Sequence, residues 1–141
     1  MTDRISAILA VIMKWAKAQS EIRGLALVGS HARNAARPDS DIDLIVLAED
    51  PESFRDPAWL AAINWSIARV RATSWSDEEY GAVWSRRVWL DPDGELEVSF
   101  AHITWADTSS VDPGTARVVQ DGCRVLYDPD GSLERLVETL R

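Results

Sequence analysis

The sequence is poor in features that define several protein classes. Cys123 is the only cysteine, so an intramolecular disulfide is impossible and no second thiolate is available for a metal site. No apolar run approaches the ~20 residues that cross a bilayer. The segment after Met1 lacks the basic start, apolar block and small-residue cleavage site of a signal peptide. We therefore expect no membrane segment and a cytoplasmic location.

Positive charge is also scarce. The chain carries 15 Lys and Arg against 23 Asp and Glu, which gives a formal net charge of −8. Such a chain repels a phosphate backbone unless its cations are concentrated, and here they are scattered along the sequence. We therefore expect no stable complex with DNA or RNA.

Two widespread catalytic signatures are missing. The sequence contains no Gly-Lys-Ser/Thr, which excludes the phosphate loop of P-loop enzymes. It also contains no Gly-x-Ser-x-Gly, which disfavours the nucleophile elbow of serine hydrolases. Any phosphate chemistry must therefore rest on a different arrangement.

What remains is the composition of an ordinary globular protein. Of 141 residues, 46% are hydrophobic and 27% are charged, which is enough apolar material for a core. No repeat, low-complexity stretch or interdomain linker interrupts the chain. We therefore expect a single domain over residues 1–141.

Hydrophobic spacing predicts helices interleaved with short strands. Thr2 or Asp3 can cap the first helix, Pro38 ends the second, and Asp91-Pro92-Asp93-Gly94 forms a hairpin turn. An α+β (α/β) domain follows from this order. The expected helices cover residues 3–20, 30–36, 57–67 and 132–140, and the expected strands cover 25–28, 41–47, 68–74, 82–90, 95–101 and 124–127.

Two carboxylates lie side by side at the start of an expected strand. Asp41 and Asp43 are two residues apart, so they project from one face while Ile42 and Leu44 face the core. Such close like charges repel unless a cation is present. Hard divalent ions such as Mg²⁺ prefer oxygen ligands, and two of them ~3.5–4 Å apart can clamp both reacting oxygens of a phosphoryl transfer. The pair therefore indicates a metal site.

A possible phosphate grip precedes this pair. Gly29 and Ser30 end one expected strand and open a short expected helix, where backbone N–H groups attract anions. Arg33, one helical turn later, can point its donors at the same anion. If the two strands are antiparallel neighbours, Ser30 and Asp41 meet at one edge of the sheet. A triphosphate could then lie between the helix terminus and the metals.

These residues together resemble a known signature. Gly29-Ser30-x-Ala32-Arg33 followed by Ser40-Asp41-x-Asp43-Leu44 is similar to the motif of the polymerase β nucleotidyltransferase superfamily, above all to its small minimal and antibiotic nucleotidyltransferases. The family usually has Gly where this chain has Asn34, a residue that also tolerates left-handed backbone geometry.

The resemblance implies a fold, an activity and site residues. The fold would be a mixed β-sheet flanked by helices. The activity would be transfer of a nucleoside monophosphate, AMP from ATP, to a hydroxyl acceptor with release of pyrophosphate and the help of two Mg²⁺ or Mn²⁺ ions. Gly29, Ser30 and Arg33 would bind the nucleotide, and Asp41 and Asp43 would hold the metals.

The family also uses a third carboxylate on a later strand, flanked by apolar residues. Glu97 fits this description, lies on the polar face of the expected hairpin and could accept the proton of the attacking hydroxyl. Glu95 shares that face beside the turn and is the second choice. Arg86 and Arg87 lie on the partner strand, and only one of them can face the site.

Several readings of the function stay open. The acceptor could be a small molecule such as an aminoglycoside, a protein hydroxyl or an RNA 3′ end. A non-catalytic or partner-directed module, such as the antitoxin of a toxin–antitoxin pair, is the main alternative, and a homodimer or a partner protein could supply a second wall. A metal-dependent glycosyltransferase also uses Asp-x-Asp but does not need the Gly-Ser element.

Overall fold

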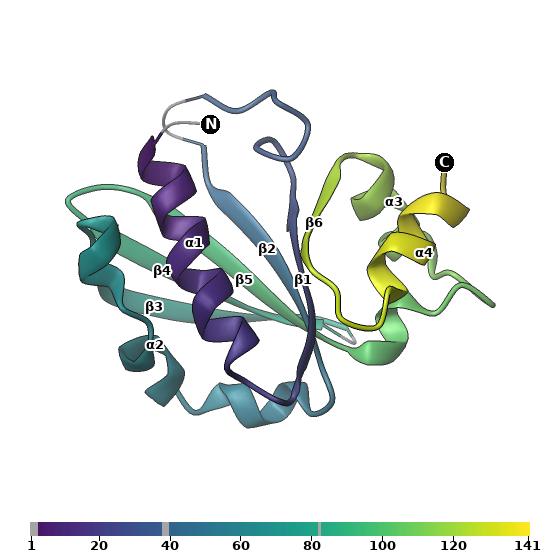
Figure 1. Ribbon diagram of the computed structural model, residues 1–141, viewed down its shortest axis with the longest axis horizontal. Coiled ribbons are helices and arrows are strands. Elements are labelled where there is room, and N and C mark those ends of the chain that lie inside the picture. The colour runs from purple at the N-terminus through teal and green to yellow at the C-terminus, as the bar shows by residue number, and fades with distance from the viewer. Residues whose placement is uncertain (1–2, 38–39, 82) are drawn as a thin grey trace.

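The computed structural model describes residues 3–37, 40–81 and 83–141 (Figure 1). The cap at Thr2, the stop at Pro38 and the first residue of the strand expected at Ala82 lie outside the described residues. The strands are β1 Ile22–Val28, β2 Ile42–Ala48, β3 Arg71–Tyr80, β4 Val83–Asp91, β5 Glu95–His102 and β6 Cys123–Tyr127. The helices are α1 Asp3–Lys17, α2 Ala58–Ala62, α3 Pro113–Gln120 and α4 Ser132–Thr139, with 3₁₀ turns η1 Pro51–Arg55, η2 Trp65–Ala68 and η3 Ile103–Ala106.

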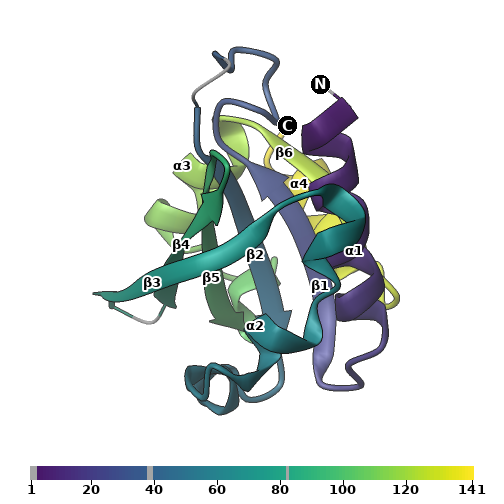
Figure 2. The same cartoon turned by 90° about the vertical axis from the view of Figure 1, so that its left-hand side faces the viewer.

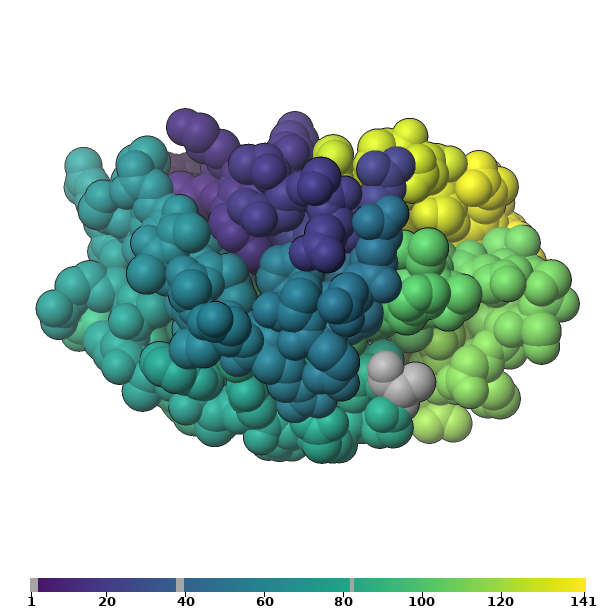
Figure 3. Space-filling model, turned by 90° about the horizontal axis from the view of Figure 1, so that it is seen from below, coloured from purple at the N-terminus to yellow at the C-terminus, as the bar shows by residue number. Residues whose placement is uncertain are grey.

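All of these strands belong to one mixed sheet, in the order β3-β4-β5-β2-β1-β6. β2 and β5 pair in parallel, and the other neighbours are antiparallel. α1 and α2 cover one face, whereas α3 and α4 lie on the other (Figure 1). The C-terminal segments gather at one end of the molecule (Figure 3). The expected α+β class, with a mixed sheet flanked by helices, is confirmed.

The central strands alternate as the sequence predicts. Ile42 and Leu44 of β2 are buried against α1, and Leu96, Val98 and Phe100 of β5 continue the same core. The intervening residues of both strands face α3 and α4, and near the start of each strand they are acidic. Apolar burial on one face therefore fixes which side chains point the other way.

The short helix expected over residues 30–36 does not form. Ala32 N and Arg33 N both donate to Gly29 O, which makes a single turn, and Asn34 then adopts φ 57°. A left-handed residue ends a helix, and one isolated turn has too few hydrogen bonds to propagate. The tolerance of Asn34 for left-handed geometry is confirmed, but the segment is a tight loop.

Other boundaries also differ from expectation. The helix expected over 57–67 divides into α2 and η2, which are separated by extended backbone at Ile63. β3 begins later and runs longer than the strand expected over 68–74 (Figure 2). Its bounds are hard to predict because nearly all of its residues are exposed, so the sequence shows no apolar alternation there. α3 was not expected, although Asp112 caps its start and Pro113 occupies its first position, a recognisable signal. No helix within the described residues has the length and apolar character that a bilayer crossing needs.

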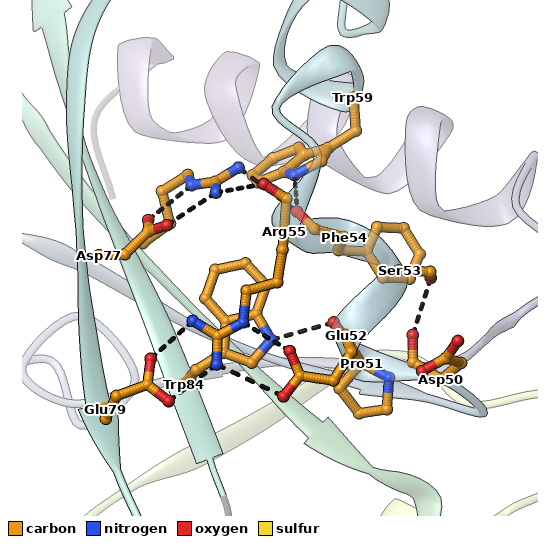
Figure 4. Close-up of polar contacts among 11 residues, drawn as sticks. Asp50, Pro51, Glu52, Ser53, Phe54, Arg55, Trp59, Asp77, Glu79 and Trp84 are labelled. Atoms are coloured by element: carbon orange, nitrogen blue, oxygen red, sulfur yellow. Dashed lines mark hydrogen bonds and ion pairs between the residues drawn. The ribbon is translucent and has the colours of Figure 1, made fainter.

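A buried arginine fixes η1 to the outer strands. Arg86 of β4 has a side chain only 1% exposed, and its guanidinium donates to the Asp77 carboxylate at 2.7 and 2.9 Å. It also donates to the backbone oxygens of Phe54 and Arg55. Figure 4 shows the neighbouring clamp, in which Arg55 lies over the Trp84 ring and bonds two glutamates. The ring faces near Arg86 are those of Trp59, Trp75 and Trp84.

Replacing Asp77 tests this arrangement. Asp77→Asn leaves the buried guanidinium with a neutral partner, so we expect a loss of roughly 2 kcal/mol of unfolding free energy, below the ~3–5 kcal/mol of a fully buried pair because Asp77 is partly exposed. The Arg86 hydrogen bonds hold the pKa of Asp77 below its ordinary 3.8. The stabilisation is therefore complete above pH 3.8 and is lost as the pH falls through the lower folded-state pKa.

Urea unfolding at pH 7 and at pH 3 measures both effects. The gap between the wild type and Asp77→Asn should narrow at pH 3, whereas exposed Asp121→Asn should show little change at either pH. An equal gap at both pH values would contradict the role given to the Asp77 charge.

Candidate active site

The site begins where β1 ends beside β2. Val28 and Asp43 are register partners in this antiparallel pair, so the loop that follows β1 starts next to the Asp43 side chain. Gly29 has φ +74°, and a Cβ at this position would lie 2.5 Å from Asp43 Oδ2. Only glycine combines that backbone angle with such a close approach. The loop backbone and the acidic strand are thereby brought into direct contact.

The loop after Gly29 is held in one shape and borders a hollow. Ala35 N donates to Ser30 O, and the His31 ring is buried with Nε2 3.2 Å from Ser40 O. The buried position of His31 agrees with a structural role. The hollow has a volume of about 540 Å³ and is lined by Gly29, Ser30, Arg33, Arg37, Ser40, Asp41 and Asp43.

A third carboxylate joins the pair through the parallel strands. Asp43 and Glu97 are register partners of β2 and β5, and Glu97 is in turn the partner of Arg87 on β4. Arg87 is therefore the arginine that faces the site, while Arg86 points into the opposite core. The Arg87 guanidinium bonds Asp41 and Glu97 at 2.7 Å and Glu95 at 2.9 Å.

The surroundings of Asp43 disfavour its ionised form. Burial, followed by the charges of Glu97 and Asp41, raises its pKa to about 6, against opposing effects of Arg87 and Arg33. The partners of the Arg87 guanidinium are Asp41, Glu95 and Glu97, so Asp43 is left with repulsive neighbours. A cation near Asp43 would favour the ionised carboxylate.

The donors fit a divalent metal in kind, but their arrangement is held by Arg87. Asp41, Asp43 and Glu97 offer the carboxylate oxygens that Mg²⁺ and Mn²⁺ prefer. Among the residues that the structure describes, no three acidic, His or Cys side chains form a ready metal site. The Arg87 guanidinium bonds oxygens of both Asp41 and Glu97. Movement of that guanidinium is the change a metal at these oxygens would need.

A wider groove starts on the other side of Glu97. It has a volume of about 770 Å³ and runs over β5 between the end of β3 and α3. Lys and Arg are absent from the described residues that line it, in contrast to the hollow beside Ser30. Asp43 lines the hollow, and its register partner Glu97 lines the groove. The groove is lined by Ile45, Tyr80, Gly81, Val83, Ser85, Glu97, Ser99, Ala101, His102, Thr104, Trp105, Ser110, Asp112, Gly114, Thr115 and Val118.

The family follows from a match over most of the chain. The model of the nucleotidyltransferase domain family matches residues 10–123, which include the loop after β1, both aspartates and Glu97. The chain belongs to the nucleotidyltransferase domain family. Nucleotidyl transfer is the general activity of that family. No curated protein matches this chain.

One solved structure supports the fold. An aminoglycoside 6-adenyltransferase from Bacillus subtilis superposes with a TM-score of 0.54 at 16% identity, over 77% of this chain and 38% of that chain. A nucleotidyltransferase-like protein from Exiguobacterium sibiricum 255-15 gives a TM-score of 0.47 at 15% identity, over 96% of this chain and 38% of that chain. The chain thus spans 38% of the length of either structure, and a single domain over 1–141 stays a prediction.

The structure brings the residues predicted for the site together. Gly29, Ser30, Arg33, Asp41 and Asp43 line one hollow, and Glu97 lies beside Asp43 across the strand pairing. Their roles in binding and catalysis stay predictions. Sequence reasoning missed two contributors that carried no motif: Arg37, which borders the hollow, and Gly122, where a Cβ would come 3.1 Å from the Arg33 Cβ.

A pair of glycine replacements tests the contact between loop and strand. Gly29→Ala adds a methyl group against Asp43 Oδ2 at φ +74°, whereas Gly81→Ala has φ +68° with nothing within 4 Å of the new Cβ. The αL strain of about 1–2 kcal/mol is common to both. We expect Gly29→Ala to lower the unfolding free energy by at least about 1 kcal/mol more than Gly81→Ala. Urea unfolding measures the difference, and equal losses would contradict the contact.

Proposed function

We propose that this chain transfers a nucleoside monophosphate, AMP from ATP, to a hydroxyl acceptor and releases pyrophosphate. The observation that carries the proposal is the contact of the Gly29 backbone with Asp43, whose register partner is Glu97. A phosphate-binding loop and three carboxylates are otherwise unrelated features. Here the loop and the carboxylates lie near one end of the central strands β1, β2 and β5, and phosphoryl transfer between a bound triphosphate and an acceptor requires such proximity.

The triphosphate would lie in the hollow beside the loop. Ser30 supplies a hydroxyl and the loop supplies backbone N–H donors, which bind anions where successive amides form a concave turn. Arg33 and Arg37 add positive charge at the border of the same hollow. In this proposal the tight loop after Gly29 binds the phosphates, the role that the sequence assigns to a helix N-terminus.

Asp41, Asp43 and Glu97 would hold the divalent ions, Mg²⁺ or Mn²⁺. Bound there, the ions would neutralise charge on the phosphates and on the attacking oxygen. The raised pKa of Asp43, about 6, supports this assignment because burial and the charges of Glu97 and Asp41 disfavour its ionised form, which a nearby cation would stabilise. Glu95 is bound to Arg87 beside the hairpin turn and stays the second choice as third ligand.

Glu97 also borders the acceptor side of the reaction. It lines the wide groove and is the register partner of Asp43, which supports a role for its carboxylate as acceptor of the proton from an acceptor hydroxyl. The hydroxyl oxygen then bonds the α-phosphorus while the bond from that phosphorus to the bridging oxygen breaks. Pyrophosphate leaves with the bridging oxygen, and the proton ends on Glu97.

The charges of the groove favour an acceptor without phosphate groups. The groove contains Glu97 and Asp112 but no lining Lys or Arg among the described residues, so an anionic acceptor such as RNA would be repelled. Its volume of about 770 Å³ lies within the range of small-molecule sites. Hydroxyl side chains and Trp105 suit an uncharged or cationic compound with several hydroxyl groups.

The test uses ATP labelled at the α-phosphate. Purified protein with Mg²⁺ is given the low-mass, protein and RNA fractions of a cell extract. We expect label in the low-mass fraction, and no transfer when the label is on the γ-phosphate. Asp43→Asn should reduce transfer by at least on the order of 100-fold, because even outer partners of metal ligands are worth roughly 10–100-fold.

The control variant is Asp56→Asn, which changes an exposed aspartate near η1 and should transfer as the wild type does. Unchanged transfer by Asp43→Asn, or no label from any triphosphate in any fraction, would overturn the proposed function. Label on RNA alone would keep nucleotidyl transfer and overturn the acceptor class.

A further inference from the structure

The Arg87 side chain stands where the proposed metals need oxygens. Its Nη2 bonds Glu97, and its Nη1 is shared between Asp41 and Glu95. The side chain is 26% exposed, so the guanidinium is enclosed by the cluster and still has access to solvent. The proposed function uses Asp41 and Glu97, keeps Glu95 only as the second choice for the third ligand, and gives no task to Arg87.

We propose that Arg87 is a resident counter-cation that competes with divalent ions for Asp41 and Glu97, and that Glu95 holds its guanidinium when the ions bind. The idea rests on the proposed metal site and deepens it by naming what occupies the site beforehand. The guanidinium offsets the repulsion of three acids in the absence of metal. Its presence also lowers the affinity of the site for metal until the guanidinium moves.

Comparison of the two neighbouring arginines supports a movable role. The Arg86 side chain is 1% exposed and donates to backbone oxygens of η1. Moving this guanidinium would remove the hydrogen bonds that hold η1 to β4. The bonds of Arg87 go to carboxylate side chains, the groups that a metal ion would take over. A metal ion at the same oxygens would repel the guanidinium, because both are cations and would lie only a few ångströms apart.

Glu95 is placed to retain the arginine after such a change. It belongs to the same face of β5 as Glu97, lies beside the hairpin turn and is 40% exposed. Its bond to Nη1 does not depend on Asp41 or Glu97, so Arg87 can release those two acids and keep a charged partner. The arginine stem is long enough to pivot while β4 keeps its strand pairing.

The experiment measures Mn²⁺ binding to the nucleotide-free protein by electron paramagnetic resonance. Arg87→Met should raise Mn²⁺ affinity by about tenfold or more, since charge-assisted hydrogen bonds to two ligands no longer compete. Arg87→Lys keeps the charge but loses the two-pronged contact, so it should give a smaller increase. Arg71→Met removes the same charge from an arginine paired with Asp91 and should change nothing.

Glu95→Gln should change the Mn²⁺ affinity in the opposite direction. Without its retaining partner, Arg87 stays on Asp41 and Glu97, so Mn²⁺ affinity should fall about threefold in the wild type and much less in an Arg87→Met background. This double-mutant comparison separates retention of Arg87 from the general effect of removing an acid. If Arg87→Met does not fold, Arg87→Gln, which also removes the charge, serves as the background.

The outcomes are distinct. An Arg87→Met protein that binds Mn²⁺ no better than the wild type, or an Arg87→Lys protein identical to the wild type, overturns the competition. An equal effect of Glu95→Gln in both backgrounds overturns the retaining role of Glu95. Tighter Mn²⁺ binding without any nucleotidyl transfer by the wild type would retain this inference and remove the proposed function instead.

Discussion

Repulsion among Asp41, Asp43 and Glu97 is the constraint on which the arrangement of this site depends. The pairing of β2 with β5 fixes Asp43 beside Glu97, and burial of the opposite strand faces prevents either side chain from turning away. The Arg87 guanidinium offsets part of the repulsion. Burial, together with the charges of Glu97 and Asp41, raises the pKa of Asp43, the member of the cluster that Arg87 does not bond.

The two faces of β4 show two uses of arginine. Arg86 lies in the tryptophan-rich core, where its carboxylate and backbone partners hold η1 in place. Arg87, the next residue, contacts three acidic side chains near solvent. The alternation of a strand separates the structural cation from the one in the site.

Much of the site could be predicted from the sequence because its main contacts follow strand register. Asp41, Asp43 and Glu97 lie on faces that the apolar residues Ile42 and Val98 define, so their side of the sheet is readable from alternation alone. The loop after Gly29 was wrongly expected to be a helix because alanine and arginine favour helices locally. The close contact of Gly29 with Asp43 and the left-handed Asn34 are tertiary features that propensity does not describe. The groove beside α3 was missed with that helix, since the signal at Asp112 and Pro113 had no long apolar pattern behind it.

A crystal structure with Mn²⁺ and a non-hydrolysable ATP analogue tests the central claim most directly, because anomalous scattering locates the manganese. The account predicts manganese at oxygens of Asp41, Asp43 and Glu97, about 2.0–2.3 Å away, with phosphates at Ser30 and Arg33 and with the Arg87 guanidinium turned to Glu95. Manganese bound away from these carboxylates, or a triphosphate lying in the groove beside Trp105, would contradict it.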